Sequence, residues 1–316
     1  MILKKNTYRL LIRARQQISL GSISLHNNEN YHPFFIIGSG RSGNTLLRRI
    51  LNNHPKLFIP PETYELGRSI RQSLKYPMMS WIDLVSLIYS NIQFNPEFET
   101  FGIKDLGELY RRVCQAENTQ RSVAYIINSF YEYYREKHGI RSERWGDKTP
   151  LNTLSLDEIH AVFPNAKFVH IVRNPVDCIS SYLRAGVYSE IKTATSRWRR
   201  SIEAATRFGK KSADQYFEIN YENLVRNPDS VVEQVCSFLD VDFQPELLSS
   251  ADVEQLGDVA MREHHKNVSK PINTNSIGNG YQQFSPAEIQ TIKHLLMQSK
   301  NKRLHNILSQ YHLDES

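Results

Sequence analysis

Hydrophobic residues along the chain follow two patterns, short continuous runs and runs with helical spacing. Residues 34–37, 166–172 and 216–219 are short runs rich in aromatic and β-branched side chains, which predicts buried strands. Residues 55–61 form a short apolar run pinned by prolines, which predicts an edge strand or a strand end. Helical spacing predicts helices at roughly 64–75, 79–91, 105–116, 121–138, 157–163, 176–184, 193–208, 229–239 and 286–298.

Strands that alternate with helices favour an α/β fold with a central parallel sheet. The expected architecture is a P-loop-like three-layer sandwich, in which helices flank the sheet on both faces. No linker or internal repeat divides the chain, so we predict one domain over residues 33–316, with a helical insertion around 64–140. Residues 1–32 form a separate basic N-terminal segment. The polar run 220–224 is expected to be the exit loop of the last strand.

A glycine-rich turn follows the first strand and leads into a helix whose apolar positions begin at Leu46. Glycines at positions 38, 40 and 43 let the backbone approach a ligand closely. The turn aims free N–H groups and the positive end of a helix dipole at one point, which favours binding of a phosphate-like anion.

The spacing of this turn is nearly that of a P-loop, with Asn44 at the position of the phosphate-binding Lys, followed by Thr45. That Lys works beside Mg²⁺ on the phosphates of ATP. Arg41, inside the turn, could supply the missing positive charge. A small-molecule kinase that uses ATP and Mg²⁺ is therefore the alternative interpretation, and Asn44 disfavours it.

Further polar side chains follow the other predicted strands. Arg173 comes directly after residues 166–172, Ser181 lies one helical stretch later, and Tyr221 follows residues 216–219. Ligands of open parallel sheets bind at the carboxyl ends of the strands. A nucleotide with phosphates at two positions would explain two separate cation-bearing strand ends.

Composition and charge exclude few classes of ligand or partner. The chain has 316 residues, of which 40% are hydrophobic and 23% charged, as in ordinary globular proteins. A net charge of +6 suits an anionic ligand, nucleic acid or an anionic membrane surface. Three widely spaced cysteines indicate neither a disulfide framework nor a zinc site, and a reducing compartment fits them best.

Residues 1–20 mix five cations with short apolar runs that are too short to span a bilayer. This pattern fits either an N-terminal helix packed on the surface or a basic amphipathic helix lying on a membrane. We expect a cytoplasmic protein, with peripheral membrane contact through residues 1–20 as an open alternative.

Five motifs, in order over about residues 33–286, resemble the sulfotransferases that use 3′-phosphoadenosine 5′-phosphosulfate. Residues 41–47 look like the family's loop for the 5′-phosphosulfate, and residues 171–175 with Ser181 look like its 3′-phosphate site. Residues 221–224 resemble the segment whose Tyr approaches the adenosine. The bacterial carbohydrate-type enzymes and the tyrosylprotein sulfotransferases are the most similar branches, and we expect a bacterial enzyme.

Two further motifs resemble the segments that carry the family's catalytic groups. Residues 61–63 match the segment that holds the catalytic glutamate of the tyrosylprotein branch, which implies Glu62 as general base. Residues 145–150 are similar to a bacterial run whose Lys lies near the transferred group, which implies Lys148. Arg41 would share the stabilisation of charge on the leaving phosphate.

The resemblance implies a sulfuryl transfer to an acceptor hydroxyl of a carbohydrate, a glycolipid or a peptide tyrosine. It implies 3′-phosphoadenosine 5′-phosphosulfate (PAPS) as donor, adenosine 3′,5′-bisphosphate (PAP) as product, no required metal and no nucleic-acid partner. The cofactor-binding residues that it implies are Arg41, Ser42, Gly43, Asn44, Thr45, Leu46, Arg173, Ser181, Tyr221 and Lys270.

The sequence also departs from the family at one place. After residues 276–278 the family has a cation and a Trp, whereas this chain has Asn279 and Gly280. Part of the clamp on the nucleotide is then expected from residues 264–273, with Lys266 and Lys270.

Several of these residues keep a structural alternative. Glu62 could cap the next helix, Lys148 could pair with Asp147, and Tyr221 could be a core residue. His170, inside a strand, is expected to be a packed structural histidine. The basic helix 193–208 is expected to present a solvated face, although acidic acceptors could use its arginines, Arg197, Arg199 and Arg200.

Overall fold

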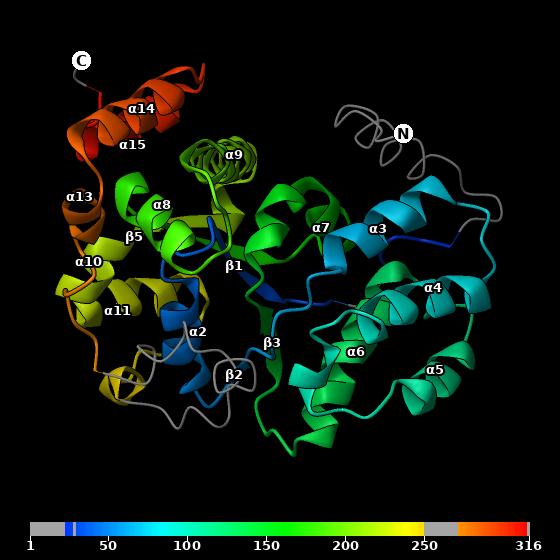
Figure 1. Cartoon of the computed structure of the whole chain (residues 1–316). Helices are drawn as coiled ribbons and strands as arrows, with labels where there is room; N and C mark the ends of the chain where they lie inside the picture. Colours follow the sequence, from blue (N-terminus) through cyan, green and yellow to red (C-terminus); the bar gives the residue numbers. More distant parts are fainter. Residues whose placement is uncertain (1–22, 28–29, 250–270, 315–316) are drawn as a thin grey trace.

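A parallel sheet is the centre of the computed structural model, which describes residues 23–27, 30–249 and 271–314 (Figure 1). Over these residues the sheet has five strands in the order β2-β3-β1-β4-β5. Their bounds are β1 Phe34–Gly38, β2 Leu57–Phe58, β3 Arg144–Asp147, β4 Lys167–Val172 and β5 Tyr216–Asn220. Because β1 is the central strand, the glycine-rich turn leaves the sheet at its middle.

Helices cover both faces of the sheet. Phe34 and Ile36 of β1 pack against α2 (Asn44–Asn52), α10 (Tyr221–Arg226) and α11 (Pro228–Phe238). Phe35 and Ile37 point to the opposite face, where α7 (Leu156–Val162) and α9 (Ile191–Gly209) lie. The predicted three-layer α/β architecture is therefore confirmed.

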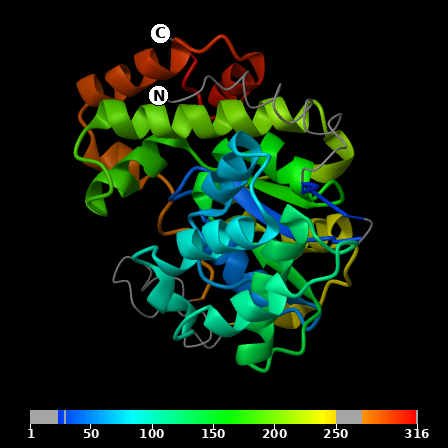
Figure 2. The same cartoon turned by 90° about the vertical axis from the view of Figure 1, so that its right-hand side faces the viewer.

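The long helix α9 also joins the sheet to the C-terminal helices (Figure 2). A third core cluster lies among α8 (Pro175–Arg184), α9, α14 (Pro286–Met297) and α15 (Lys302–Gln310). The short helix α13 (Asn279–Gln283) packs against α8. The helix that follows the predicted phosphate site is thus held from several sides.

Four helices come between β2 and β3 and lie to one side of the sheet (Figure 1). They confirm the helices predicted at roughly 64–75, 79–91, 105–116 and 121–138. Their bounds are α3 Leu66–Lys75, α4 Trp81–Gln93, α5 Gly107–Cys114 and α6 Val123–Lys137. Short 3₁₀ turns occur at η1 Phe98–Phe101, η2 Pro150–Leu154, η3 Ala213–Gln215 and η4 Pro245–Leu248.

The predicted strands are confirmed, and over the part of the chain that the structure describes β2 is an edge strand whose one partner is β3, as its prolines indicated. The prediction missed β3, because residues 144–147 show neither alternation nor an apolar run. Gly146 is required there, since a Cβ at this position would lie 2.4 Å from the Phe34 ring.

The expectation that residues 220–224 form an exit loop is wrong. Asn220 is the N-cap of α10, and its side chain accepts a hydrogen bond from Asn223 N at 3.0 Å. An Asn at this position begins a helix by satisfying a free backbone N–H. Tyr221 is therefore the first residue of a helix.

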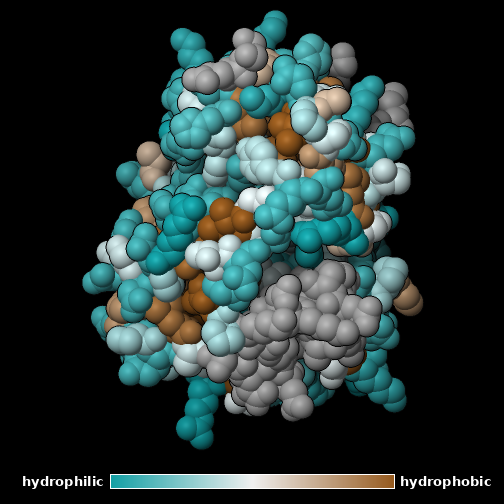
Figure 3. Space-filling model, turned by 60° about the vertical axis from the view of Figure 1, so that its left-hand side comes forward, coloured by the Kyte–Doolittle hydropathy of each residue, from teal (hydrophilic) through white to brown (hydrophobic). Residues whose placement is uncertain are grey.

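Residues 1–22 and 250–270 lie outside the described residues, and so do two predictions that fall on them, the basic segment 1–20 and the nucleotide contact of Lys270. Among the helices that the structure describes, none is long and apolar enough to cross a membrane. The face shown in Figure 3 is mainly hydrophilic, with small separate hydrophobic areas.

Candidate active site

The glycine-rich turn joins β1 to α2 and has the backbone that its glycines predict. Gly38 has a φ of 149° and Gly43 a φ of 97°, while Arg41 between them has a φ of 65°. Gly43 is the N-cap of α2, which has no side-chain cap and no acidic residue in its first turn. The first N–H groups of α2 therefore lack side-chain partners and point at the turn, which suits an anion.

Arg41 connects this turn to the second predicted phosphate site. Its Nε donates to Ser181 Oγ on α8 at 3.1 Å, and its carbonyl oxygen accepts from Arg173 at 3.0 Å. Burial, and then the nearby charge of Arg173, lower the pKa of the Arg41 guanidinium. Two cations that follow two neighbouring strands therefore lie close together, and among the described residues no carboxylate forms an ion pair with either, which favours an anionic ligand at this point.

Tyr221 lies against both phosphate elements. Its ring occupies the space where a Cβ at Gly43 would come within 2.4 Å, and the Arg173 guanidinium lies 4.5 Å from the ring centroid. Its hydroxyl is 2.6 Å from Ser276 Oγ. Tyr221 is buried and packs in the core cluster beneath the turn, which confirms the core alternative, whereas its contact with the adenosine stays a prediction.

The side chains of the other turn residues are mostly engaged within the protein, so these residues offer mainly their backbone N–H groups to a ligand. Asn44 donates from Nδ2 to the Ser39 carbonyl at 2.7 Å, so its side chain braces the turn internally. Ser42 is buried with Oγ 3.4 Å from Cys178 Sγ, and Leu46 packs against the core. Thr45 is half-buried at the start of α2. Because Asn44 stands where a P-loop has its Lys and its side chain hydrogen-bonds within the turn, the kinase alternative is not favoured.

Glu62 and Lys148 form a buried ion pair between Lys148 Nζ and Glu62 Oε1. The Lys148 side chain is 1% exposed and the Glu62 side chain 11%. The structure thus pairs Glu62, predicted as the general base, with Lys148, predicted to lie near the transferred group. Lys148 does not pair with Asp147, and Glu62 lies outside α3, whose N-cap is Glu65.

Asp147 fixes the segment that carries Glu62. It accepts hydrogen bonds from Thr63 Oγ1 at 2.8 Å, Tyr131 OH at 2.7 Å and Asn152 Nδ2 at 2.7 Å. Burial raises the pKa of the Asp147 carboxyl, although the hydrogen bonds from Tyr131 and Thr63 act in the opposite direction. Asp147 is a positioning residue, which the sequence motif contained but did not identify.

Lys148 directly follows β3, whose last residue, Asp147, pairs with Phe35 in the middle of the sheet. The 3₁₀ turn η2 follows directly, and its Thr153 hydrogen-bonds both the N–H and the carbonyl of Gly38. One short segment therefore holds Lys148 and the first residue of the glycine-rich turn together.

The arginines of α9 separate into different environments. Arg197 is buried and donates to the Pro150 carbonyl at 3.0 Å, whereas Arg199 donates to the Leu295 carbonyl on α14 at 2.9 Å and Arg200 is exposed. The prediction of a wholly solvated face is therefore wrong for Arg197. Helical spacing alone does not show which side of a basic helix faces the sheet.

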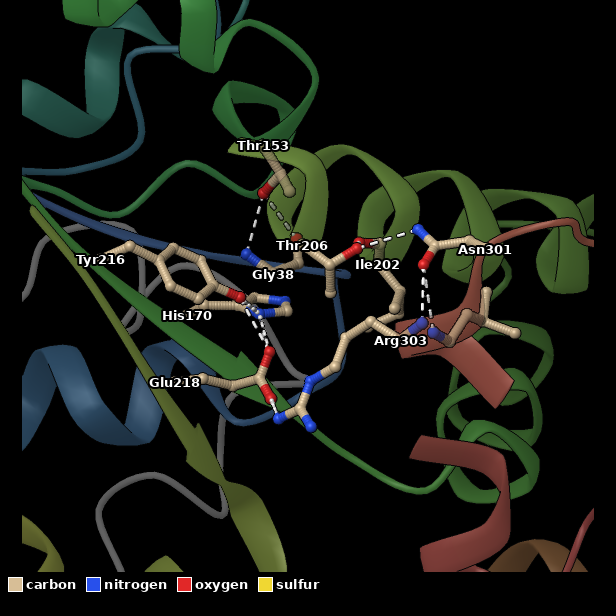
Figure 4. Close-up of polar contacts among 10 residues, drawn as sticks. Gly38, Thr153, His170, Ile202, Thr206, Tyr216, Glu218, Asn301 and Arg303 are labelled. Atoms are coloured by element: carbon tan, nitrogen blue, oxygen red, sulfur yellow. Dashed lines mark hydrogen bonds and ion pairs between the residues drawn. The ribbon is translucent and has the colours of Figure 1, made fainter. Parts of the chain in front are cut away.

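His170 is fully buried in β4, with Nδ1 2.6 Å from Tyr216 OH and 3.1 Å from Glu218 Oε2 (Figure 4). The predicted structural histidine is confirmed. Among the residues with described placement, no group of three or more His, Cys, Asp or Glu side chains is arranged to hold a metal ion.

The segment that departs from the family packs tightly on α8. Gly278 and Gly280 donate their N–H groups to the Asp177 carboxylate at 2.9 and 2.7 Å. A Cβ at position 280 would lie 2.5 Å from the Val176 carbonyl, so this backbone approach requires glycine. The family's Trp could not replace Gly280 without moving this backbone.

A groove of about 750 Å³ opens on the far side of this segment. It is lined by residues of β5, α10, α13 and α15, together with Asn174 and Asp177 at the start of α8 and Tyr311 after α15. Arg41, Glu62 and Lys148 are not among its lining residues. The groove therefore borders the 3′-phosphate side of the candidate site and does not contain the residues predicted to act in the transfer.

Comparison with known proteins agrees with this arrangement. A family model described as "Sulfotransferase family" matches residues 33–245. A Caenorhabditis elegans protein named "Protein-tyrosine sulfotransferase A" is 23% identical over 275 residues, which cover 80% of this chain and 63% of that protein. A Danio rerio protein named "Protein-tyrosine sulfotransferase 1" is 22% identical, over 79% of this chain and 66% of its own length. The chain thus spans slightly under two thirds of these two relatives.

Two solved structures share the fold over most of the chain. The sulfotransferase domain of the Synechococcus PCC 7002 olefin synthase is 28% identical with a TM-score of 0.57, and it covers 84% of this chain and 96% of that domain. The sulfotransferase domain from the curacin biosynthetic pathway is 23% identical with a TM-score of 0.52, over 89% of this chain and 98% of that domain.

Proposed function

Because the chain belongs to the sulfotransferase family, we propose that it transfers a sulfuryl group from PAPS to an acceptor hydroxyl. The observation that carries this proposal is the contact of Arg41 with Ser181 and Arg173. It brings the turn suited to a 5′-phosphosulfate next to a second cationic site suited to a 3′-phosphate. A donor with phosphates at both positions would engage both.

The residues present fit this donor. Gly43 leaves the space beneath the turn to the Tyr221 ring, and the first N–H groups of α2 face the turn. The buried Nε of Arg173 has no hydrogen-bond partner among the described residues. We assign Arg173 and Ser181 to the 3′-phosphate, Tyr221 to the adenosine side, and the turn backbone with Arg41 and Thr45 to the 5′-phosphate.

Transfer requires attack of the acceptor oxygen on sulfur, cleavage of the bond from sulfur to the bridging oxygen, and removal of the acceptor proton. Glu62 would accept that proton, since among the described residues only Lys148 hydrogen-bonds its carboxylate. Lys148 and Arg41 would stabilise the charge that develops on the bridging oxygen, which leaves with PAP. The ion pair keeps the base and this cation within reach of one another.

We further propose peptide tyrosine as the first acceptor to test, supported by the names of the two animal relatives. A carbohydrate or a glycolipid remains the alternative acceptor class. Localisation in the cytoplasm, a bacterial origin and membrane contact through residues 1–20 stay predictions from the sequence.

A nucleotide comparison tests the proposed donor. Thermal unfolding would be measured with PAP, with ATP and Mg²⁺, and with an oligonucleotide, and we expect PAP alone to raise the midpoint strongly, because a ligand stabilises the state that it binds. A preference for ATP with Mg²⁺ would contradict the proposal. Transfer of radiolabelled sulfate from PAPS to tyrosine peptides and to saccharides would then identify the acceptor class.

A further inference from the structure

Arg197 is a buried cation beside the transfer residues that the mechanism above does not use. Its side chain projects from α9 toward the sheet, and the residue is 8% exposed. One terminal nitrogen donates to the Pro150 carbonyl at 3.0 Å. The other terminal nitrogen, Nη1, is buried without a hydrogen-bond partner among the described residues. A buried guanidinium with an unused donor is costly unless a ligand completes it.

The neighbours of Arg197 belong to the point of transfer. Pro150 comes two residues after Lys148, which pairs with Glu62. On the other side Arg197 interacts electrostatically with Tyr182: burial raises the pKa of Tyr182 to about 12, while the positive charge of Arg197 acts in the opposite direction.

Tyr182 in turn covers the first half of the glycine-rich turn. Its hydroxyl is 3.0 Å from Ser39 Oγ and would be 2.7 Å from a Cβ placed on Gly40. Arg197 therefore lies between η2, which begins two residues after Lys148, and Tyr182, which covers the residues that precede Arg41.

The other cations of the site each have polar partners, although the Nε of Arg173 is also without one among the described residues. Arg41 contacts Ser181, Arg173 contacts the carbonyls of Arg41 and Ser276, and Lys148 contacts Glu62. Among the residues with described placement, no carboxylate forms an ion pair with Arg197. The sulfuryl group carries negative charge on three non-bridging oxygens, and none of the assignments above supplies a donor to them.

We propose that Arg197 Nη1 binds a non-bridging oxygen of the sulfuryl group during transfer, which makes Arg197 a further catalytic residue. The inference rests on the proposed function. A planar guanidinium held by the Pro150 carbonyl is preorganised, so it stabilises the moving group without rearranging.

PAP and PAPS differ only by the sulfuryl group, so they isolate this contact. Calorimetric dissociation constants for both nucleotides would be measured, without acceptor, in the wild type, Arg197→Gln and Arg197→Lys. We expect Arg197→Gln to weaken PAPS about 10-fold, to leave PAP unchanged and to lower kcat about 100-fold. Arg197→Lys keeps the charge and should recover part of both losses. Arg207→Gln, at an exposed position in the last turn of the same helix, is the control and should match the wild type.

Other results would overturn the inference in recognisable ways. Equal weakening of PAP and PAPS, with a lower unfolding midpoint, would show that Arg197 only supports η2. A higher KM for the acceptor with unchanged PAPS affinity would place Arg197 on the acceptor instead. A wild-type protein that bound neither nucleotide would overturn the proposed function, and the inference with it, whereas normal nucleotide binding in all variants would overturn the inference alone.

Discussion

The hydroxyl of Thr153 hydrogen-bonds both backbone polar groups of Gly38. Its Oγ1 accepts from Gly38 N at 2.8 Å and donates to Gly38 O at 2.9 Å. Thr153 belongs to η2, which follows Lys148, whereas Gly38 ends β1 and begins the glycine-rich turn. This contact fixes the start of the proposed 5′-phosphosulfate loop relative to the ion pair of Lys148 and Glu62. The hydrogen bonds thereby hold together two segments that are 115 positions apart in the chain.

Replacing Thr153 by Val keeps the shape of the side chain and removes both hydrogen bonds. Because the Gly38 N–H is buried, we expect a loss of about 1–3 kcal/mol in the free energy of unfolding. The turn should also bind PAP more weakly, since its backbone donors lose their fixed position. Denaturant unfolding and calorimetry would measure the two effects. Thr153→Ser keeps the hydroxyl and should behave like the wild type; equal PAP affinity in Val and Ser variants would refute the positioning role.

Glu62→Gln tests the proposed base. The amide cannot accept the acceptor proton, so kcat should fall by about 10²–10⁴. PAP affinity should remain close to that of the wild type, because Glu62 lies on the acceptor side. Steady-state transfer assays and calorimetry would separate the two. Glu65→Gln, three residues further at the N-terminus of α3, is the matched control. Wild-type turnover in Glu62→Gln would eliminate Glu62 as the base.

Ser181→Ala tests the 3′-phosphate site. A hydroxyl that bonds a charged phosphate contributes about 1.5–3 kcal/mol, so PAP should bind roughly 10-fold or more weakly. Adenosine 5′-phosphate lacks the 3′-phosphate, and its affinity should not change. The neighbouring Ser180 contacts Gln283 instead, at 2.6 Å, so Ser180→Ala serves as the control. An equal loss for both nucleotides would move the 3′-phosphate away from Ser181.

The sequence predicted most of the elements that carry the site, because their patterns are local. The strand before the glycine-rich turn, the strand before Arg173 and the edge strand at Leu57–Phe58 are each marked by short apolar runs and Gly or Pro. Strand β3 was missed, because residues Arg144–Asp147 form a strand only through pairing with β1 and β2. Local propensity carries no information on such long-range pairing.

The sequence predicted the motifs of the candidate site but not the contacts between their side chains. Glu62 and Lys148 were each identified from short segments, yet nothing local indicates that they pair, since 86 positions separate them. The support from Asp147 and Thr153 depends likewise on how η2 folds back on β1. Arg197 was placed on a solvated face, because a charged helix position becomes buried only when its partner elements are known.

The last prediction concerns a half-buried carboxylate away from the site, Glu218 on β5 (Figure 4). Burial alone would raise its pKa, but hydrogen bonds from His170, Tyr216 and Arg303 outweigh burial and lower the pKa of Glu218 to about 2. Arg303 comes from α15, so this carboxylate ties the C-terminal helix to the sheet at 2.7 Å.

A carboxylate whose pKa is lower in the folded state stabilises the fold above its unfolded pKa, near 4.5, and loses that contribution as the pH falls toward 2. The shift corresponds to about 3 kcal/mol. Glu218→Gln should therefore be less stable than the wild type by roughly that amount at pH 7, and the difference should shrink steadily between pH 4.5 and 2. Denaturant unfolding at several pH values measures this, with Glu136→Gln, in an exposed pair with Arg112, as a control expected to change stability by less than about 1 kcal/mol. A stability difference that stayed constant with pH would show that Glu218 acts through packing and not through its charge.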